Sequence, residues 1–264
     1  MEPAMSSDEE MKSSPRSNGV PVPTDRKRFT FQHGWFDEII EDWEELTKPL
    51  RGKKLNVLEI GCFEGASTTW MLDNLMEHPD SRMTVIDTFS GGMEHQEGNV
   101  LSVNYDLGSL EHRFQTNVSK CQHVSKLRVI KALSDDALTA LRQEKARFDF
   151  VYIDGSHIAI DVLHDAVLCW RMLELQGTMV FDDLAWNGYN EDCYNPCIAI
   201  VSFVQCVTQE AETRETVSQM WVTKVPTSIP ATPNPDPDLR YWGENHRISD
   251  AIKRISVSSY IENK

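Results

Sequence analysis

The sequence predicts an α/β fold in which a mostly parallel β-sheet is covered by helices on both faces. Two observations lead to this prediction. Short apolar runs typical of buried strands alternate with longer segments of helical periodicity between residues 55 and 183. Strands that are separated by helices in this way usually pair in parallel. The chain has 264 residues, 40% of them hydrophobic, which suits one such domain with a sizeable core.

Each element follows from its own apolar pattern. The predicted strands of the alternating region are residues 55–61, 83–89, 127–133, 148–155 and 177–183. The predicted helices between them are residues 65–78, 109–123, 134–145 and 158–174. A further helix over 197–210 and a strand over 218–225 complete the predicted domain.

The two ends of the chain differ in composition from this region. Residues 1–27 are polar and rich in Ser and Pro, so we expect a disordered tail before a domain that spans 28–264. From Trp35 to Leu46, apolar residues recur at helical spacing, which predicts an amphipathic helix that packs on the core or forms a lid. Closely spaced prolines exclude a regular helix or central strand over 226–240, and a short helix is expected over 246–256.

Composition excludes several classes of partner. The 41 acidic and 26 basic side chains give a net charge of −15, which argues against nucleic acid or an anionic membrane as the main partner. No apolar run approaches the roughly 18 residues of a membrane span, and we expect a cytoplasmic protein. The six cysteines are scattered without CxxC spacing and are predicted to be free thiols.

A glycine pair marks the first candidate binding feature. Gly61 and Gly65 follow the strand 55–61 and open the next helix, so the backbone can turn tightly and approach a ligand closely. The G-x-x-x-G spacing differs from the G-x-G-x-x-G of nicotinamide-binding proteins, and no Walker-type Lys-Ser/Thr is present. Alone, the pair is equally compatible with a purely structural turn.

Two further strand ends carry polar groups suited to an adenosine. Asp87 lies at the end of the strand 83–89, where a carboxylate can accept hydrogen bonds from both hydroxyls of a ribose. Ser134 follows the strand 127–133, where an adenine edge would lie.

The segments VLEIGCFEGAST, VIDTF, FDFVYIDGSH and VFDD resemble the successive motifs of class I methyltransferases that depend on S-adenosylmethionine (SAM). Within that class, IDGSH followed by FDD resembles the metal-dependent small-molecule O-methyltransferases of the macrocin and mycinamicin type and, more distantly, catechol O-methyltransferase. The resemblance spans about residues 50–225. It implies a Rossmann-like, mostly parallel seven-stranded sheet with helices on both faces, and it is compatible with a homo-oligomer.

The resemblance also assigns roles to residues of the cofactor site. It implies that Glu59, Gly61 and Gly65 shape the methionine pocket, that Asp87 holds the ribose, and that Ser134 lies on the adenine side.

A second constellation follows the last two strands of the alternating region. Asp154 ends one strand and Asp182 and Asp183 end the other, so three carboxylates converge if these strands are neighbours. Clustered anions repel unless a cation joins them, and oxygen ligands suit Mg²⁺ or a similar divalent ion. The alternative is that Asp182 or Asp183 only caps the following segment. We also assign Asp154 to the cofactor site and to the catalytic residues.

His157 lies three residues beyond Asp154 and is the candidate general base, because imidazole accepts a proton near neutral pH. The resemblance supports this role, since the histidine of this motif is a proposed base in the sugar-modifying enzymes. Alternatively, His157 packs on the adenine or caps the helix from residue 158. Further side chains that could face a substrate are Trp35, Met93, His95, Tyr105, Trp186, Asn187, Tyr189 and Tyr194.

These patterns favour metal-assisted O-methylation of a small hydroxylated molecule by SAM. Two alternatives remain, a SAM-dependent N- or S-methyltransferase without metal and a non-catalytic interaction protein with a SAM fold. A nicotinamide oxidoreductase is the least favoured because the glycine spacing differs.

Overall fold

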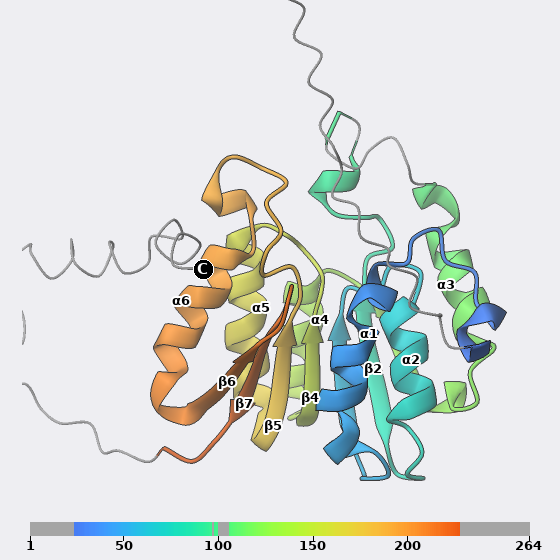
Figure 1. Ribbon diagram of the computed structural model, residues 1–264, viewed down its shortest axis with the longest axis horizontal. Helices are drawn as coiled ribbons and strands as arrows, with labels where there is room; N and C mark the ends of the chain where they lie inside the picture. The colour runs from blue at the N-terminus through green and yellow to red at the C-terminus, as the bar shows by residue number, and fades with distance from the viewer. Residues whose placement is uncertain (1–23, 97, 100–105, 228–264) are drawn as a thin grey trace, which may run out of the picture.

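The computed structural model describes residues 24–96, 98–99 and 106–227 (Figure 1). At its centre is a seven-stranded sheet with the strand order β3-β2-β1-β4-β5-β7-β6. The strands are β1 (Asn56–Ile60), β2 (Arg82–Asp87), β3 (Leu127–Lys131), β4 (Phe148–Ile153), β5 (Leu173–Phe181), β6 (Ala211–Glu215) and β7 (Met220–Lys224).

The sheet is mixed, which corrects the expectation of a mostly parallel one. The four pairings among β1 to β5 are parallel, whereas β7 pairs antiparallel with both β5 and β6. A short connection suffices between β6 and β7 because antiparallel neighbours need no crossover. The sequence did not predict β6, since its residues AETRE are polar and lie at the exposed edge of the sheet.

Helices cover both faces of the sheet, as predicted. They are α1 (Trp35–Leu46), α2 (Ala66–Asn74), α3 (Leu110–Val118), α4 (Ser134–Gln143), α5 (Ala159–Met172) and α6 (Cys197–Val207). Successive residues of a strand point to opposite faces, and in β1 Val57 packs in one apolar cluster with α1, α2 and α3. The next residue, Leu58, packs in a second cluster with α4, α5 and α6. The core therefore lies in two layers, one on each side of the sheet.

The first described residues pack against the domain. Helix η1 (Thr24–Arg28) contains Arg26, whose side chain is buried, lies 2.8 Å from an oxygen of Asp37 and donates to the carbonyl of Ala66. Residues 24–27 therefore do not belong to the expected tail. The rest of that tail, most of the proline-rich segment and the expected helix 246–256 lie outside the described residues.

Three smaller findings complete the comparison with the sequence. Strand β5 begins at Leu173, four residues earlier than predicted. The sequence did not predict this first part of the strand because its residues are mostly exposed and form no apolar run. The six cysteines are free thiols, as predicted. Within the part of the chain that the structure describes, no helix has the length and apolar character needed to cross a bilayer.

Candidate active site

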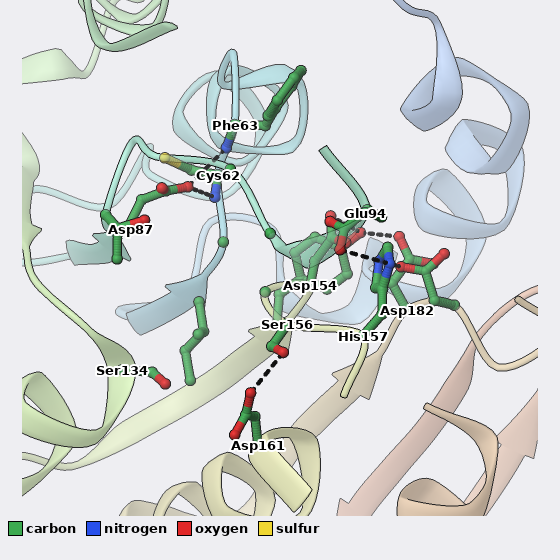
Figure 2. A pocket seen from close by; sticks show the side chains of 18 of the residues that line it. Cys62, Phe63, Asp87, Glu94, Ser134, Asp154, Ser156, His157, Asp161 and Asp182 are labelled. Atoms are coloured by element: carbon green, nitrogen blue, oxygen red, sulfur yellow. Dashed lines mark hydrogen bonds and ion pairs between the residues drawn. The ribbon is translucent and has the colours of Figure 1, made fainter. Parts of the chain in front are cut away.

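A cavity of about 930 Å³ opens at the carboxyl ends of the parallel strands (Figure 2). In sheets of this kind ligands bind at this edge, because the loops that follow each strand converge there. The cavity is lined by residues from all five predicted strand ends and the loops after them, including Gly61, Asp87, Ser134, Asp154 and Asp183.

The turn after β1 needs glycine for steric reasons. Gly61 has a φ of +78°, and a Cβ atom there would lie 1.9 Å from the carbonyl oxygen of Asp154. Gly65 has a φ of +84°, and its Cβ would lie 3.0 Å from the ring of Phe114. Of these two glycines, Gly61 lines the cavity, whereas Gly65 lies against α3 and allows α2 to pack closely on it. The assignment of Gly65 to the cofactor site therefore stays a prediction.

Glu59 lies beneath this turn and does not line the cavity. Its side chain is fully buried and accepts hydrogen bonds from Ser67 and, at 2.5 Å, from Thr68 in the first turn of α2. Burial raises the pKa of Glu59 to about 8. Its assignment to the cofactor site therefore stays a prediction, and the role visible here is to tie α2 to β1.

The raised pKa of Glu59 predicts a specific dependence of stability on pH. A carboxyl group whose pKa is higher in the folded than in the unfolded state stabilises the fold below its unfolded pKa, and that stability is lost as the pH rises toward its folded pKa. Glu59→Gln keeps the shape and removes the titration. Between about pH 5 and pH 8, the free energy of unfolding should therefore fall more steeply in the wild type than in Glu59→Gln, by at most about 1.4 kcal/mol per pH unit. Urea unfolding of both proteins at several pH values measures this difference, and parallel pH curves would contradict the prediction.

Asp87 braces the same turn from β2. Its Oδ2 atom accepts hydrogen bonds from the backbone amides of Cys62 (2.7 Å) and Phe63 (3.0 Å) (Figure 2). Its Oδ1 atom accepts a hydrogen bond from the backbone amide of Phe89 (2.6 Å). A carboxylate has about four lone-pair positions, so it can accept a further hydrogen bond from a ligand in the cavity. Ser134, the first residue of α4, also lines the cavity, in keeping with its predicted place.

Acidic residues and a histidine gather where β4 and β5 end. Ligand atoms of Asp154, His157 and Asp183 all lie within 4.8 Å of one another, and His157 Nε2 is 2.8 Å from Asp183 Oδ2. Asp182 is not in this group, because its carboxylate accepts hydrogen bonds from Tyr152 and Gln219. Asp183 has a φ of +58°, in the left-handed region, and this turn directs the two neighbouring carboxylates to different partners.

The electrostatics of this cluster favour an added positive charge. Burial, together with the charges of Asp182 and Asp183, raises the pKa of Asp154 well above its usual value. Burial also raises the pKa of Asp182 to about 6. For His157, burial alone would lower the pKa, but the hydrogen bond to Asp183 and the charges of Asp183 and Glu94 raise it. A proton or a metal ion therefore stabilises this group of carboxylates.

Glu94 is a site residue that the sequence did not single out. It comes from the loop after β2 and is buried, with Oε1 2.9 Å from His95 Nδ1 and Oε2 3.8 Å from His157 Nδ1. Burial alone would raise the pKa of Glu94, but the two histidines outweigh it and the pKa is lowered. His157 thus lies between the carboxylates of Asp183 and Glu94.

Aromatic side chains surround the rest of the cavity. Trp35, at the start of α1, is 48% exposed and stacks on His33 with 4.8 Å between ring centroids, while α1 buries its apolar face in the core. Trp186 packs on the ring of His157, with 4.3 Å between centroids. Of the predicted substrate-facing residues, the structure places Trp35, Met93, His95 and Trp186 on the cavity wall; Asn187, Tyr189 and Tyr194 do not line it, and Tyr105 lies outside the described residues.

With this geometry in place, the chain can be compared with known protein families and structures. Residues 58–184 match the model of a family described as a methyltransferase domain. Residues 58–184, slightly less than half of the chain, are therefore similar to a methyltransferase domain. The match begins within β1, ends just after β5, and includes each residue predicted for the catalytic, cofactor and metal sites. The search of curated proteins found no match.

Several solved structures share the fold of this chain at low sequence identity. The MycE methyltransferase of the mycinamycin biosynthetic pathway, solved with Mg, S-adenosylhomocysteine (SAH) and mycinamycin VI, is 15% identical with a TM-score of 0.53. That match covers 79% of this chain but only 56% of MycE, so the chain spans little more than half of MycE. The O-methyltransferase TomG from Streptomyces achromogenes, solved with SAM, is 16% identical with a TM-score of 0.51, over 70% of this chain and 79% of TomG. An O-methyltransferase from Bacillus cereus, solved with SAH, is 16% identical with a TM-score of 0.53, over 76% of this chain and 86% of the Bacillus protein.

Proposed function

We propose that the protein transfers the methyl group of SAM to a hydroxyl oxygen of a small molecule, assisted by a divalent cation. The observation that carries the proposal is the group formed by Asp154, His157 and Asp183, which faces the same cavity as the turn after β1. The group could hold a cation and also contains a histidine placed to accept a proton. A metal-free transfer to nitrogen or sulfur would have no need of this combination.

The cavity has the features that SAM requires. Gly61 allows the backbone to approach a ligand, and the carboxylate of Asp87 lies beside that turn with acceptor capacity to spare. Ser134 lines the cavity at the end of the next strand. We assign the methionine part of SAM to the turn, the ribose to Asp87 and the adenine to the side of Ser134. TomG was solved with SAM and MycE with SAH, which agrees with this assignment.

The donor set also fits a divalent cation. Carboxylate oxygens are ligands that suit Mg²⁺ or Mn²⁺, and those of Asp154 and Asp183 lie within 4.8 Å of each other, close enough to share a single ion. In our proposal Asp154 and Asp183 would hold the ion, and Asp182 beside them adds a third negative charge. A bound ion would lower the pKa of a hydroxyl that coordinates it. MycE was solved with Mg, which supports the proposal by fold likeness only.

His157 then serves as the general base. The methyl carbon leaves the sulfonium sulfur of SAM and bonds to the acceptor oxygen, while the hydroxyl proton passes to His157. Asp183 and Glu94 stabilise the resulting imidazolium, because both carboxylates face the ring. Since SAM is already electrophilic, the remaining task of the protein is to align the two reactants, and the walls of the cavity do this.

Chelation tests this function directly. Purified protein is incubated with methyl-labelled SAM and a panel of small polyhydroxylated molecules, and labelled product is counted with and without EDTA. We expect chelation to abolish transfer and added Mg²⁺ to restore it, because the carboxylates would otherwise repel one another and the acceptor would lose its activation. Transfer to amines or thiols that EDTA does not affect would contradict the proposal and favour N- or S-methylation.

A further inference from the structure

A chain of buried hydrogen bonds runs from the core of the domain to the acidic cluster. Gln219, the residue before β7, is fully buried, and its Oε1 accepts hydrogen bonds from the indole N–H groups of Trp43 (2.9 Å) and Trp221 (3.3 Å). Its Nε2 donates to Asp182 Oδ1 at 3.2 Å. Trp43 is fully buried and comes from α1, so the chain connects three elements that are distant in sequence.

The two tryptophans fix the orientation of the amide. An indole N–H can only donate, so the oxygen of Gln219 must face Trp43 and Trp221, and its NH₂ group must face Asp182. The reverse orientation would place donors against donors and an oxygen against the carboxylate. The adjacent backbone adds a further anchor, since Leu184 donates to the carbonyl of Ser218 at 2.8 Å. Asp182 is therefore held by both its side chain and the segment that follows it.

Tyr152 links Asp182 to Asp154. Its hydroxyl group, on a side chain only 1% exposed, donates to Asp182 Oδ2 and also lies 3.1 Å from Asp154 Oδ2. One hydroxyl has a single proton, so it can satisfy only one of the two carboxylates at a time. The structure therefore holds the two carboxylates close together with one hydrogen-bond donor too few, and a proton or a nearby cation would offset this deficit.

We propose that Gln219 and Tyr152 are positioning residues that hold Asp182 and Asp154 in place for cation binding, with Trp43 and Trp221 orienting Gln219. The proposal rests on the proposed function, because it assumes that the acidic cluster binds a divalent ion. Groups that hydrogen-bond to the residues around a metal typically change its affinity by about 10–100-fold when they are lost.

The test measures binding of Mn²⁺ alone to the full chain saturated with SAH, by titration calorimetry. Gln219→Met removes the amide and keeps a similar volume, and Tyr152→Phe removes only the hydroxyl. Each should weaken Mn²⁺ binding by about 10–100-fold. The matched control is Thr223→Val. It removes a partly buried hydrogen bond between the hydroxyl groups of Thr178 in β5 and Thr223 in β7 (3.1 Å) and does not alter the acidic cluster. It should leave Mn²⁺ affinity unchanged.

A double variant separates positioning from general weakening of the fold. If Gln219 acts through Asp182, Gln219→Met should cause little further loss of Mn²⁺ affinity in an Asp182→Asn background. Additive losses, an equal loss in Thr223→Val, or wild-type affinity in both Gln219→Met and Tyr152→Phe would overturn the positioning role while leaving the proposed function intact. Absence of Mn²⁺ binding by the wild-type protein would overturn both, so the two failures are distinguishable.

Discussion

Replacing His157 with alanine is expected to lower the rate of methyl transfer by about 10²–10⁴-fold, the usual contribution of a general base. The side chain lies 2.8 Å from Asp183 and faces Glu94, so both carboxylates stabilise the protonated ring that forms when it takes the acceptor's proton. Because a base must be unprotonated, wild-type kcat/KM should rise with pH through the raised pKa of His157. Steady-state kinetics with the acceptor found in the labelled-SAM assay measure both quantities.

Two comparisons make the His157 result specific. His112→Ala removes an exposed histidine of α3 that does not line the cavity, and it should leave turnover unchanged. In His157→Ala, a higher pH should recover part of the lost rate, because hydroxide can replace a missing base. A loss below tenfold with an unaltered pH profile would show that His157 does not take the proton. If instead Mn²⁺ no longer binds to His157→Ala, the imidazole is a ligand of the ion.

The second large effect is expected at Asp87. Asp87→Ala should weaken binding of SAH by more than about tenfold, because it removes the carboxylate that we assign to the ribose. A charge-assisted hydrogen bond contributes about 1.5–3 kcal/mol, and about 1.4 kcal/mol corresponds to one decade. The same change also frees the amides of Cys62 and Phe63, which shape the turn. Titration calorimetry with SAH measures the affinity.

A charge-matched control accompanies the Asp87 experiment. Glu144→Ala also removes one negative charge, but Glu144 pairs with Arg128 outside the cavity. The affinity of the Glu144→Ala variant for SAH should therefore match that of the wild type. Circular dichroism tests whether the Asp87→Ala variant is folded. A folded Asp87→Ala variant with wild-type affinity would rule out the ribose assignment.

The sequence predicted the part of the site that depends on strand ends. Parallel strands deliver their carboxyl ends to one edge of a sheet, so Asp87, Asp154 and the Asp182–Asp183 pair had to converge once the alternation of strands and helices was recognised. The hydrogen bond from the amide of Asp182 to the carbonyl of Ile153 (3.0 Å) shows that β4 and β5 are neighbours at this edge.

The remaining site residues left no pattern in the sequence. Glu94 lies in a polar loop without periodicity, and Tyr152 looks like any apolar residue of a buried strand. Gln219 reaches the cluster only because β7 inserts antiparallel between β5 and β6, a pairing that depends on tertiary contacts. The burial of Arg26 similarly depends on Ala66, forty positions away. These contacts join residues that are distant in the sequence, so local sequence patterns cannot predict them.

Anomalous diffraction from crystals grown with SAH and Mn²⁺ tests the central claim most directly. We expect one anomalous peak within ligand distance of Asp154 and Asp183, in the same cavity as SAH and beside His157. Density for SAH against Asp87 with no anomalous peak at the acidic cluster would contradict the cation-assisted mechanism.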